Sequence, residues 1–342
     1  MRGIVYLDQR TPICLDNGFH ATAKGSGLST TVHVIVTCSN RKSRPIPAAL
    51  RLGQVAGRSA LQRARGWTSR LAQSGNAPQI AAVELYAGEH WSVARRFLTV
   101  HQPGEDIRLW VCSAGYGLIP AEARIMPYYA TLTPRRADSV PGTAAFWWSL
   151  LSEWQGPTPQ HPRSIRALVA ADPAAVFMFV LSKSYLRACG ADIAAACEYI
   201  LDLDRLLIVS VGARPQGDLA AFLVPADARL QAHFGGTRRA LNARIGAHLL
   251  STRIRSRDDA AGHLTALLAA QPPIPQYDRR RLSDGEIFNI IAGRLAAAPT
   301  TSANRLLREF RDAGLACEQQ RFTRLYRSVE EAASWPPARL VT

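Results

Sequence analysis

Two side chains suited to covalent chemistry, Cys38 and Lys42, belong to the short segment Cys38-Ser39-Asn40-Arg41-Lys42. A cysteine attacks electrophiles as its thiolate, and a neighbouring cation stabilises that form. Arg41 and Lys42 supply two such cations. We therefore predict that Cys38 and Lys42 are catalytic, and that Ser39, Asn40 and Arg41 bind substrate. A buried cysteine at the end of a strand, beside a basic loop that binds an anion, is the alternative for the same residues.

Lysine is rare in this chain, because three lysines stand against 38 arginines. This bias, together with abundant alanine, indicates a GC-rich coding background. The pKa of an amine shifts far more readily than that of a guanidinium. Lys42 is therefore predicted to serve the chemistry of Cys38 and not only to add charge.

A second group of polar residues lies in the segment CSAGYGLIP and shortly after it. Ser113 and Tyr128 offer hydroxyl groups, while Gly115 and Gly117 let the backbone approach a ligand closely. We predict Ser113 and Tyr128 as catalytic residues, and Gly115 and Gly117 as substrate-binding residues. The segment matches neither a nucleophile elbow nor a dinucleotide fingerprint. A tight turn after a strand is the alternative.

Strands and helices alternate in the part of the chain that carries these side chains. Apolar, β-branched runs predict buried strands, and the amphipathic stretches between them predict helices. Units of this kind form right-handed crossovers, so we predict an α/β fold with a mostly parallel sheet covered by helices. The expected strands are 32–39, 108–120 with its glycine turn, 176–182, 205–211 and 219–225, and the expected helices are 48–73, 84–98 and 182–201.

The carboxyl ends of parallel strands meet at one edge of the sheet, where open α/β sheets bind their ligands. The loops expected at this edge are 38–44, 113–118, 182–184 and 212–217. The prediction requires Cys38, Ser113 and Tyr128 to converge there from three separate stretches. His33 lies on an apolar strand and is expected to be a core residue.

Proline-rich segments divide the chain. We predict an N-terminal extension over residues 1–30, a catalytic α/β domain over 31–270, a linker over 271–282 and a helical nucleic-acid-binding domain over 283–335.

The last of these regions has clear helix signals. Ser283, followed three residues later by Glu286, predicts a capping box at a helix start. Gly314 separates two further helical stretches. A three-helix bundle with a helix-turn-helix core fits this pattern.

The net charge of the 342 residues is +15 and the pI is about 10.2. Such a balance favours a polyanionic partner, and we predict nucleic acid, with DNA favoured over RNA. Arg321, Arg324 and Arg327 line one face of the last helix, and Arg238 and Arg239 follow a glycine turn that could hold a phosphate. A solvated basic face, or docking on a protein, is the alternative.

Composition also excludes some classes of protein. An apolar fraction of 47% supports a buried core and excludes a wholly disordered chain. The chain has no apolar run of about 18 residues and no signal-peptide pattern, which predicts a cytoplasmic protein that does not bind membranes. Its six cysteines form no C-x-x-C pair, so we expect neither a zinc ribbon nor a disulfide framework. We also predict no other metal site and no cofactor.

Several short motifs follow one another in this chain. They are Cys38 with Lys42, Leu85-Tyr86-Ala87-Gly88 with Ala94-Arg95, Ser113-Ala114-Gly115-Tyr116-Gly117-Leu118, Pro127-Tyr128 and Thr131-Leu132. Their order resembles a bacterial and phage domain of unknown function. The Cys-x-x-x-Lys segment is also similar to the lysine-transfer motif of archaeosine synthase, although Ser43-Arg44-Pro45 follows where that motif continues with Pro-Tyr. More distantly, the expected sheet resembles the YaaA peroxide-stress family.

The resemblance implies a substrate and adds Tyr86 to the predicted substrate-binding residues. Archaeosine synthase modifies the 7-cyano group of a 7-deazaguanine base, and YaaA relatives occur in clusters that place 7-deazaguanines in DNA. One hypothesis is therefore a base-modifying enzyme in which Cys38 adds to a nitrile. The other is a non-catalytic DNA-binding component of a DNA-modification or antiphage defence system, working with other proteins of that operon.

Overall fold

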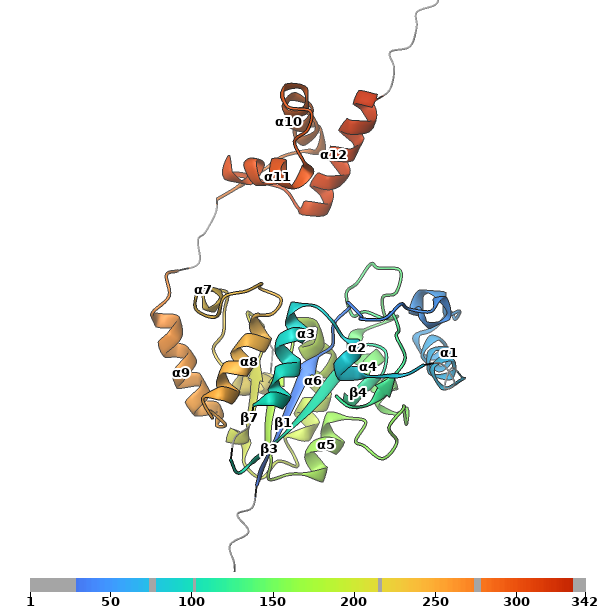
Figure 1. The fold of residues 1–342 in the computed structure, drawn as a ribbon, viewed down its shortest axis with the longest axis vertical. Helices are drawn as coiled ribbons and strands as arrows, with labels where there is room; N and C mark the ends of the chain where they lie inside the picture. The colour runs from blue at the N-terminus through green and yellow to red at the C-terminus, as the bar shows by residue number, and fades with distance from the viewer. Residues whose placement is uncertain (1–28, 74–77, 101–102, 215–216, 274–277, 335–342) are drawn as a thin grey trace, which may run out of the picture. The chain divides into compact units, whose positions relative to one another are not determined.

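The computed structural model describes residues 29–73, 78–100, 103–214, 217–273 and 278–334. Its contacts divide the chain into two compact units, Met1–Pro272 and Pro273–Thr342 (Figure 1). Each unit has its own cluster of buried apolar side chains. Residues 1–28 of the predicted N-terminal extension lie outside the described residues.

The first unit is built on a five-stranded sheet with the order β4-β3-β1-β6-β7. Neighbouring strands are parallel except for β4, which turns back antiparallel to β3. β1 lies in the centre and is buried on both faces along most of its length, which explains its nearly continuous apolar sequence. The α/β fold class is thereby confirmed. The strands are β1 (Thr30–Thr37), β3 (Glu105–Ser113), β4 (Gly117–Pro120), β6 (Val176–Val180) and β7 (Leu206–Val209).

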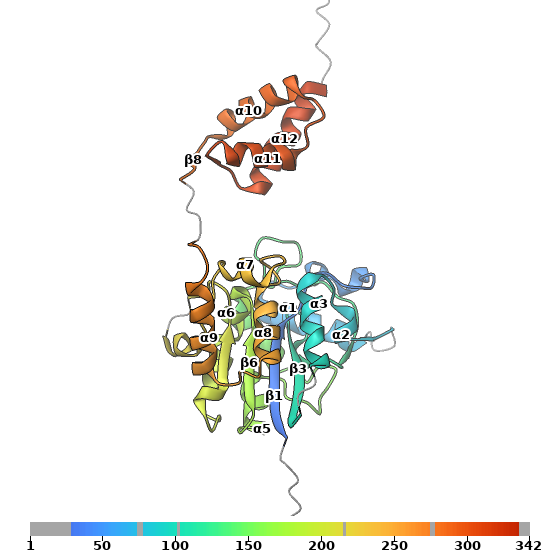
Figure 2. The same cartoon turned by 60° about the vertical axis from the view of Figure 1, so that its left-hand side comes forward.

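Helices cover both faces of this sheet. α3 packs with α8, whereas α6 packs with α4 and α5, and Figures 1 and 2 show these two groups on opposite faces. A small ladder of β2 (Ile80–Ala81) and β5 (Arg124–Ile125) lies outside the main sheet. The helices are α1 (Ala60–Gln73), α2 (Ala82–Leu85), α3 (Glu89–Ala94), α4 (Ala144–Ser152), α5 (Ile165–Ala171), α6 (Lys183–Ala196), α7 (Leu230–Phe234), α8 (Leu241–Ser251) and α9 (Arg257–Ala269).

The strand order creates a switch point beside β1. From β1 the chain crosses to β3 on one side, and it later returns to place β6 on the other side. The connection after β1 contains α3 and the connection after β6 is α6, so the two leave toward opposite faces of the sheet. In open α/β sheets, ligands bind at the carboxyl edge at such a point.

Three of the helices and strands predicted from the sequence differ from those in the structure. The helix expected over 48–73 is two 3₁₀ turns (Ala48–Leu50 and Leu52–Gln54) followed by α1. The helix expected over 84–98 is interrupted at Gly88, whose φ of +96° is incompatible with a continuous helix. The strand predicted over 219–225 is wrong, because Gly217–Phe222 forms a 3₁₀ helix. Short apolar runs do not distinguish strand from helix by periodicity alone.

The described residues of the second unit form three helices and a two-residue ladder. Ser283 and Glu286 form the expected capping box at the start of α10, and Gly314 has a φ of +74° between α11 and α12. β8 falls inside the segment predicted as a linker and pairs with β9. The elements are β8 (Arg280–Arg281), α10 (Asp284–Ala297), α11 (Ala303–Asp312), β9 (Leu315–Ala316) and α12 (Gln319–Ser334).

His33 is a core residue, as expected, with a relative exposure of 1%. Its Nδ1 atom accepts a hydrogen bond from the Trp110 indole (2.9 Å), and its Nε2 atom lies 3.2 Å from a carboxylate oxygen of Asp172. Neutral imidazole with the proton on Nε2 satisfies both partners, whereas a proton on Nδ1 would displace Trp110. Burial lowers the pKa of His33 below 6.5, although Asp172 opposes this shift.

Acidification is expected to destabilise the first unit through His33. The unfolded chain binds this proton more readily than the folded one, so stability falls as pH drops below about 6.5 and through the lower folded-state pKa. One such group contributes at most about 1.4 kcal/mol per pH unit. Urea unfolding from pH 8 to pH 5 should show a smaller acid loss in His33→Gln than in the wild type. Equal losses in both proteins would contradict this role of His33.

Within the described residues, no helix is both long and apolar enough to cross a membrane. No group of three or more His, Cys, Asp or Glu side chains in that part of the chain could hold a metal ion.

Candidate active site

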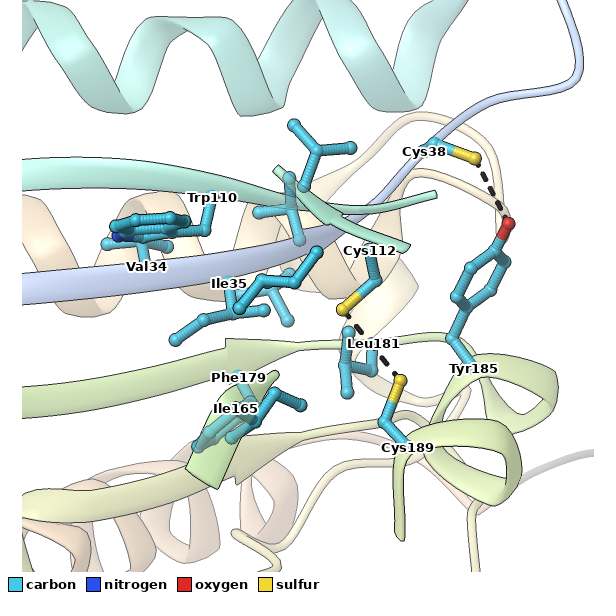
Figure 3. Packing of buried hydrophobic residues seen from close by; sticks show 14 of the residues in the cluster. Val34, Ile35, Cys38, Trp110, Cys112, Ile165, Phe179, Leu181, Tyr185 and Cys189 are labelled. Carbon is cyan, nitrogen blue, oxygen red and sulfur yellow. Dashed lines mark hydrogen bonds between the residues drawn. The ribbon is translucent and has the colours of Figure 1, made fainter. Parts of the chain in front are cut away.

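Cys38 lies directly after β1, where its amide donates to the Cys112 carbonyl (3.0 Å) and continues the pairing with β3. Its side chain is 8% exposed. The Sγ atom lies 3.0 Å from the hydroxyl oxygen of Tyr185, and Figure 3 shows the thiol and the phenol pointing toward each other. Tyr185 belongs to the first turn of α6. The Cys38–Tyr185 contact therefore spans the switch point between β1 and β6.

Three more hydroxyl groups form a network beside Cys38. The Tyr128 hydroxyl lies 3.7 Å from the Cys38 Sγ atom, 2.7 Å from Ser113 Oγ and 3.0 Å from the Tyr86 hydroxyl. All three of these side chains are buried. The structure thus brings Cys38, Ser113 and Tyr128 together from three separate stretches of the chain.

Backbone amides set the direction of this network. Ser113 Oγ accepts hydrogen bonds from the amides of Gly115 (3.2 Å) and Tyr116 (2.9 Å). A hydroxyl oxygen accepts two hydrogen bonds and donates one, so the Ser113 proton is donated to Tyr128. Tyr128 then keeps its own proton for Cys38 or Tyr86. The amides behind Ser113 therefore favour donation from Tyr128 toward the sulfur atom.

The phenols around Cys38 are held in their neutral form. Burial raises the pKa of Tyr86, Tyr128 and Tyr185 well above the usual value for a phenol, and the negative charge of a Cys38 thiolate raises all three further. Each phenol therefore keeps a proton to donate at neutral pH. Such donors stabilise negative charge on a nearby atom.

Lys42 lies over the aromatic rings of this network. Its Nζ atom is 4.5 Å from the centre of the Tyr128 ring and 5.0 Å from that of Tyr86. It donates to the carbonyls of Ser39 (2.6 Å) and Asn40 (3.4 Å). Burial lowers the pKa of Lys42, and attraction to Cys38 partly opposes the shift. The ammonium group therefore closes the loop after β1 and adds positive charge near the thiol.

The other predicted residues of this loop differ in their contacts and in their exposure to solvent. Ser39 Oγ lies 2.8 Å from the carbonyl oxygens of both Arg41 and Ala87, which ties the loop to the segment before α3. The side chains of Asn40 and Arg41 are exposed. Ser39 thus supports the loop, while Asn40 and Arg41 are accessible to a ligand.

Gly115 and Gly117 are buried, and both shape the β3–β4 hairpin. The amide of Gly115 is already bonded to Ser113. Gly117 has a φ of +72°, and the carbonyls of its two neighbours, Tyr116 and Leu118, accept hydrogen bonds from the Arg163 guanidinium. These contacts give the two glycines a structural role in holding Ser113 and Tyr128.

The glycine turn before α8 already holds an anion from the chain itself. The amide of Thr237 donates to the Glu89 carboxylate at 3.0 and 3.3 Å, and Arg244 pairs with the same carboxylate at 3.0 Å. Arg238 and Arg239 next to this turn are exposed. A phosphate on the Thr237 amide would have to displace Glu89, whereas one on the two arginines would not.

The predicted arginines of α12 differ from one another. Arg321 donates to Asp284 at 2.6 Å and to the Leu282 carbonyl at 2.9 Å, so it is used inside the second unit. Arg324 is 69% exposed and lies 3.7 Å from Asp284. Arg327 is exposed.

Two other cysteines lie near the network but are closed to solvent. The sulfur atoms of Cys112 and Cys189 are 3.8 Å apart, and neither side chain is exposed (Figure 3). Burial raises the pKa of Cys189. At 8% exposure, Cys38 is the least buried thiol of this group.

Tyr185 did not emerge from the sequence, because its partner Cys38 lies 147 residues away. The available signal was its position in the first turn of a helix that follows an apolar strand, in the loop region 182–184 already expected at the carboxyl edge.

Removing the Tyr185 hydroxyl is expected to slow alkylation of Cys38. A hydrogen bond to a charged acceptor contributes about 1.5–3 kcal/mol, so Tyr185→Phe should lower the rate with iodoacetamide at pH 7 about tenfold. Peptide mapping by mass spectrometry would follow Cys38 itself. The matched control is Tyr199→Phe, at a tyrosine that is 38% exposed. An unchanged rate in Tyr185→Phe would show that this phenol does not stabilise the thiolate.

Comparisons of this chain with family models, curated proteins and solved structures gave no match.

Proposed function

We propose that this protein is an enzyme that modifies a nucleic-acid base through the thiolate of Cys38, and that its substrate is a 7-cyano-7-deazaguanine-type base in DNA or RNA. The convergence of Tyr185, Tyr128 and Lys42 around the Cys38 sulfur carries the proposal. This set combines a nucleophile with two neutral hydrogen-bond donors, the phenols, and one cation, the lysine. The nitrile substrate follows from the resemblance of the Cys38-x-x-x-Lys42 segment to archaeosine synthase.

The first step suits the electronic properties of a nitrile. The carbon of the C≡N group is electrophilic, so the thiolate electron pair forms the S–C bond while one C–N π bond moves its pair to nitrogen. The nitrogen then takes a proton from Lys42 or from a phenol such as Tyr185. The product is a thioimidate, C(=NH)–S, on Cys38. Hydrogen bonds from the phenols stabilise the thiolate before the attack and when it leaves.

The second step releases Cys38. Water that adds to the thioimidate carbon expels the thiolate and leaves a carboxamide, whereas an amine does the same and leaves an amidine. No oxidant or reductant is consumed in either case. The choice between water and an amine is set by the co-substrate.

The exposure of the site residues indicates that a substrate would reach Cys38 past the loop after β1. Cys38 is 8% exposed and Lys42 is half-buried, while Ser113 and Tyr128 have no exposed surface. The last two therefore act on the sulfur atom as positioning residues. A substrate would approach past the exposed side chains of Asn40 and Arg41.

The burial of Cys38 and of the hydroxyl groups around it supports a second candidate function. If Cys38 stays closed to substrates, the hydroxyl network is a structural feature of the core. The protein would then be a non-catalytic DNA-binding component of a DNA-modification or antiphage defence system.

A conversion assay separates the two functions. The full chain is incubated with 7-cyano-7-deazaguanine as the free nucleoside and within DNA and RNA oligonucleotides, each with water alone, ammonium or lysine. The proposal predicts a product that has gained one water or one amine, detected by mass spectrometry. The test requires protein whose Cys38 alkylates readily. If such protein converts none of these substrates, the enzymatic function is overturned and the non-catalytic DNA-binding function is favoured.

A further inference from the structure

We propose that the exposed face of α12 binds double-stranded DNA in its major groove. This inference rests on the proposed function, in which the modified base belongs to a polymer. The face is formed by polar side chains that line one open surface: Gln319, Gln320, Thr323, Arg324, Arg327, Ser328 and Glu331.

The opposite side of α12 fixes this orientation. Phe322, Leu325, Tyr326 and Val329 are buried in the core of the second unit. Tyr326 also donates its hydroxyl proton to the carbonyl of Thr301 (2.7 Å). Because these contacts hold one side of the helix, its polar side is presented outward as a fixed surface.

Three carboxylates of the second unit already have partners within it. Asp284 pairs with Arg321 and lies near Arg324, and Glu309 pairs with Arg294 and Arg305. Glu318 accepts from two backbone amides at the start of α12.

These carboxylates are therefore not free to pair with the arginines that remain exposed. Arg280 and Arg281 on β8, and Arg327 within α12, are exposed, and the ion pairs between described residues of this unit include none of the three. β8 pairs with β9, which immediately precedes α12. These three arginines thus offer exposed positive charge for phosphate binding.

The side chains on this face favour duplex nucleic acid over other partners. The core of a protein interface is rich in aromatic and apolar side chains, and single strands stack on exposed aromatics. The seven side chains of the α12 face include neither kind. Glutamine and arginine instead form paired hydrogen bonds with base edges.

The groove geometry favours DNA over RNA. The major groove of B-DNA is wide enough to admit an α-helix, whereas the major groove of A-form RNA is deep and narrow. The chain Ala303–Ser334 forms a helix, a turn and a second helix, an arrangement that presents the second helix to the major groove.

The test uses fluorescence anisotropy of the full chain with a labelled DNA duplex of mixed sequence. Arg327→Ala should weaken binding about tenfold, and Gln320→Ala should reduce discrimination among duplex sequences. The matched control is Arg96→Ala, which removes an exposed arginine from the first unit. Circular dichroism and thermal unfolding verify that each variant is folded, and Arg324→Gln provides a second variant if one is not.

The comparison ligands decide between partners. The inference predicts weaker binding of a single strand and of an RNA duplex of the same sequence. Equal binding of RNA, or equal affinity of the wild type, Arg327→Ala and Arg324→Gln for DNA, would overturn it. Failure of the wild type to convert the free nucleoside would count against the proposed function and not against the α12 surface.

Discussion

Replacing Cys38 with alanine is expected to reduce conversion of a 7-cyano-7-deazaguanine substrate by about 10⁴-fold or more, the usual scale for loss of a nucleophile. The nearby Cys112 and Cys189 cannot replace it, because both are fully buried. The variant should remain folded. It loses its contacts with the Tyr185 and Tyr128 hydroxyls, and a buried hydroxyl left without a partner costs about 1–3 kcal/mol. Single-turnover kinetics with mass detection of the product would measure the effect.

The matched control for this variant is Cys197→Ala, which removes a half-buried thiol from the end of α6. It should leave conversion unchanged. Full conversion by Cys38→Ala would rule out covalent catalysis by this residue. The hydroxyl network would then be part of the core, as in the non-catalytic alternative.

Replacing Gly115 with alanine is expected to destabilise the first unit by about 1–3 kcal/mol, the cost of overpacking a core. A Cβ atom at this position would lie 2.4 and 2.5 Å from two ring carbons of Tyr128. That ring is fully buried and packs edge-on against Trp67 and Tyr116. It has no free space to enter, so the new methyl group should displace the Tyr128 hydroxyl from Cys38.

Gly262→Ala in α9 is the matched control, because its added Cβ would have no atom within 4 Å apart from its chain neighbours and the nearby backbone of its own helix. A helical glycine without such contacts should gain about 0.5–1 kcal/mol when alanine replaces it. The two substitutions should therefore change the free energy of unfolding in opposite directions in urea titrations. Slower alkylation of Cys38 should accompany only Gly115→Ala. Stabilisation by both would contradict the packing described for Tyr128.

The sequence was sufficient to predict the main part of the sheet and the position of Cys38. β1 is a continuous run of buried β-branched and apolar residues, and such runs identify central parallel strands without other information. The placement of Ser113 opposite Cys38 follows from register, because β1 and β3 are parallel neighbours and Thr37 pairs with Cys112. The rule that ligand sites of open α/β sheets lie at the carboxyl ends of the parallel strands is enough to predict that these two residues lie at the same edge.

Contacts that depend on distant crossovers could not be predicted in this way. Tyr185 meets Cys38 because β6 lies beside β1, and the strand order was not available from periodicity. The Glu89 carboxylate reaches the Thr237 amide across 148 residues for the same kind of reason. The regular spacing of Arg321 with Arg324 and Arg327 also hid the fact that Asp284 engages the first of them.

Detection of a covalent intermediate on Cys38 tests the central claim most directly. The full chain is mixed with the nitrile substrate in the absence of amines, quenched in acid at successive times within a single turnover and digested for peptide mapping by mass spectrometry. The account predicts that the peptide containing Cys38 gains the full mass of the substrate, because thioimidate formation loses no atoms. Product formation with no such adduct at any time, or an adduct on a different cysteine, would contradict it.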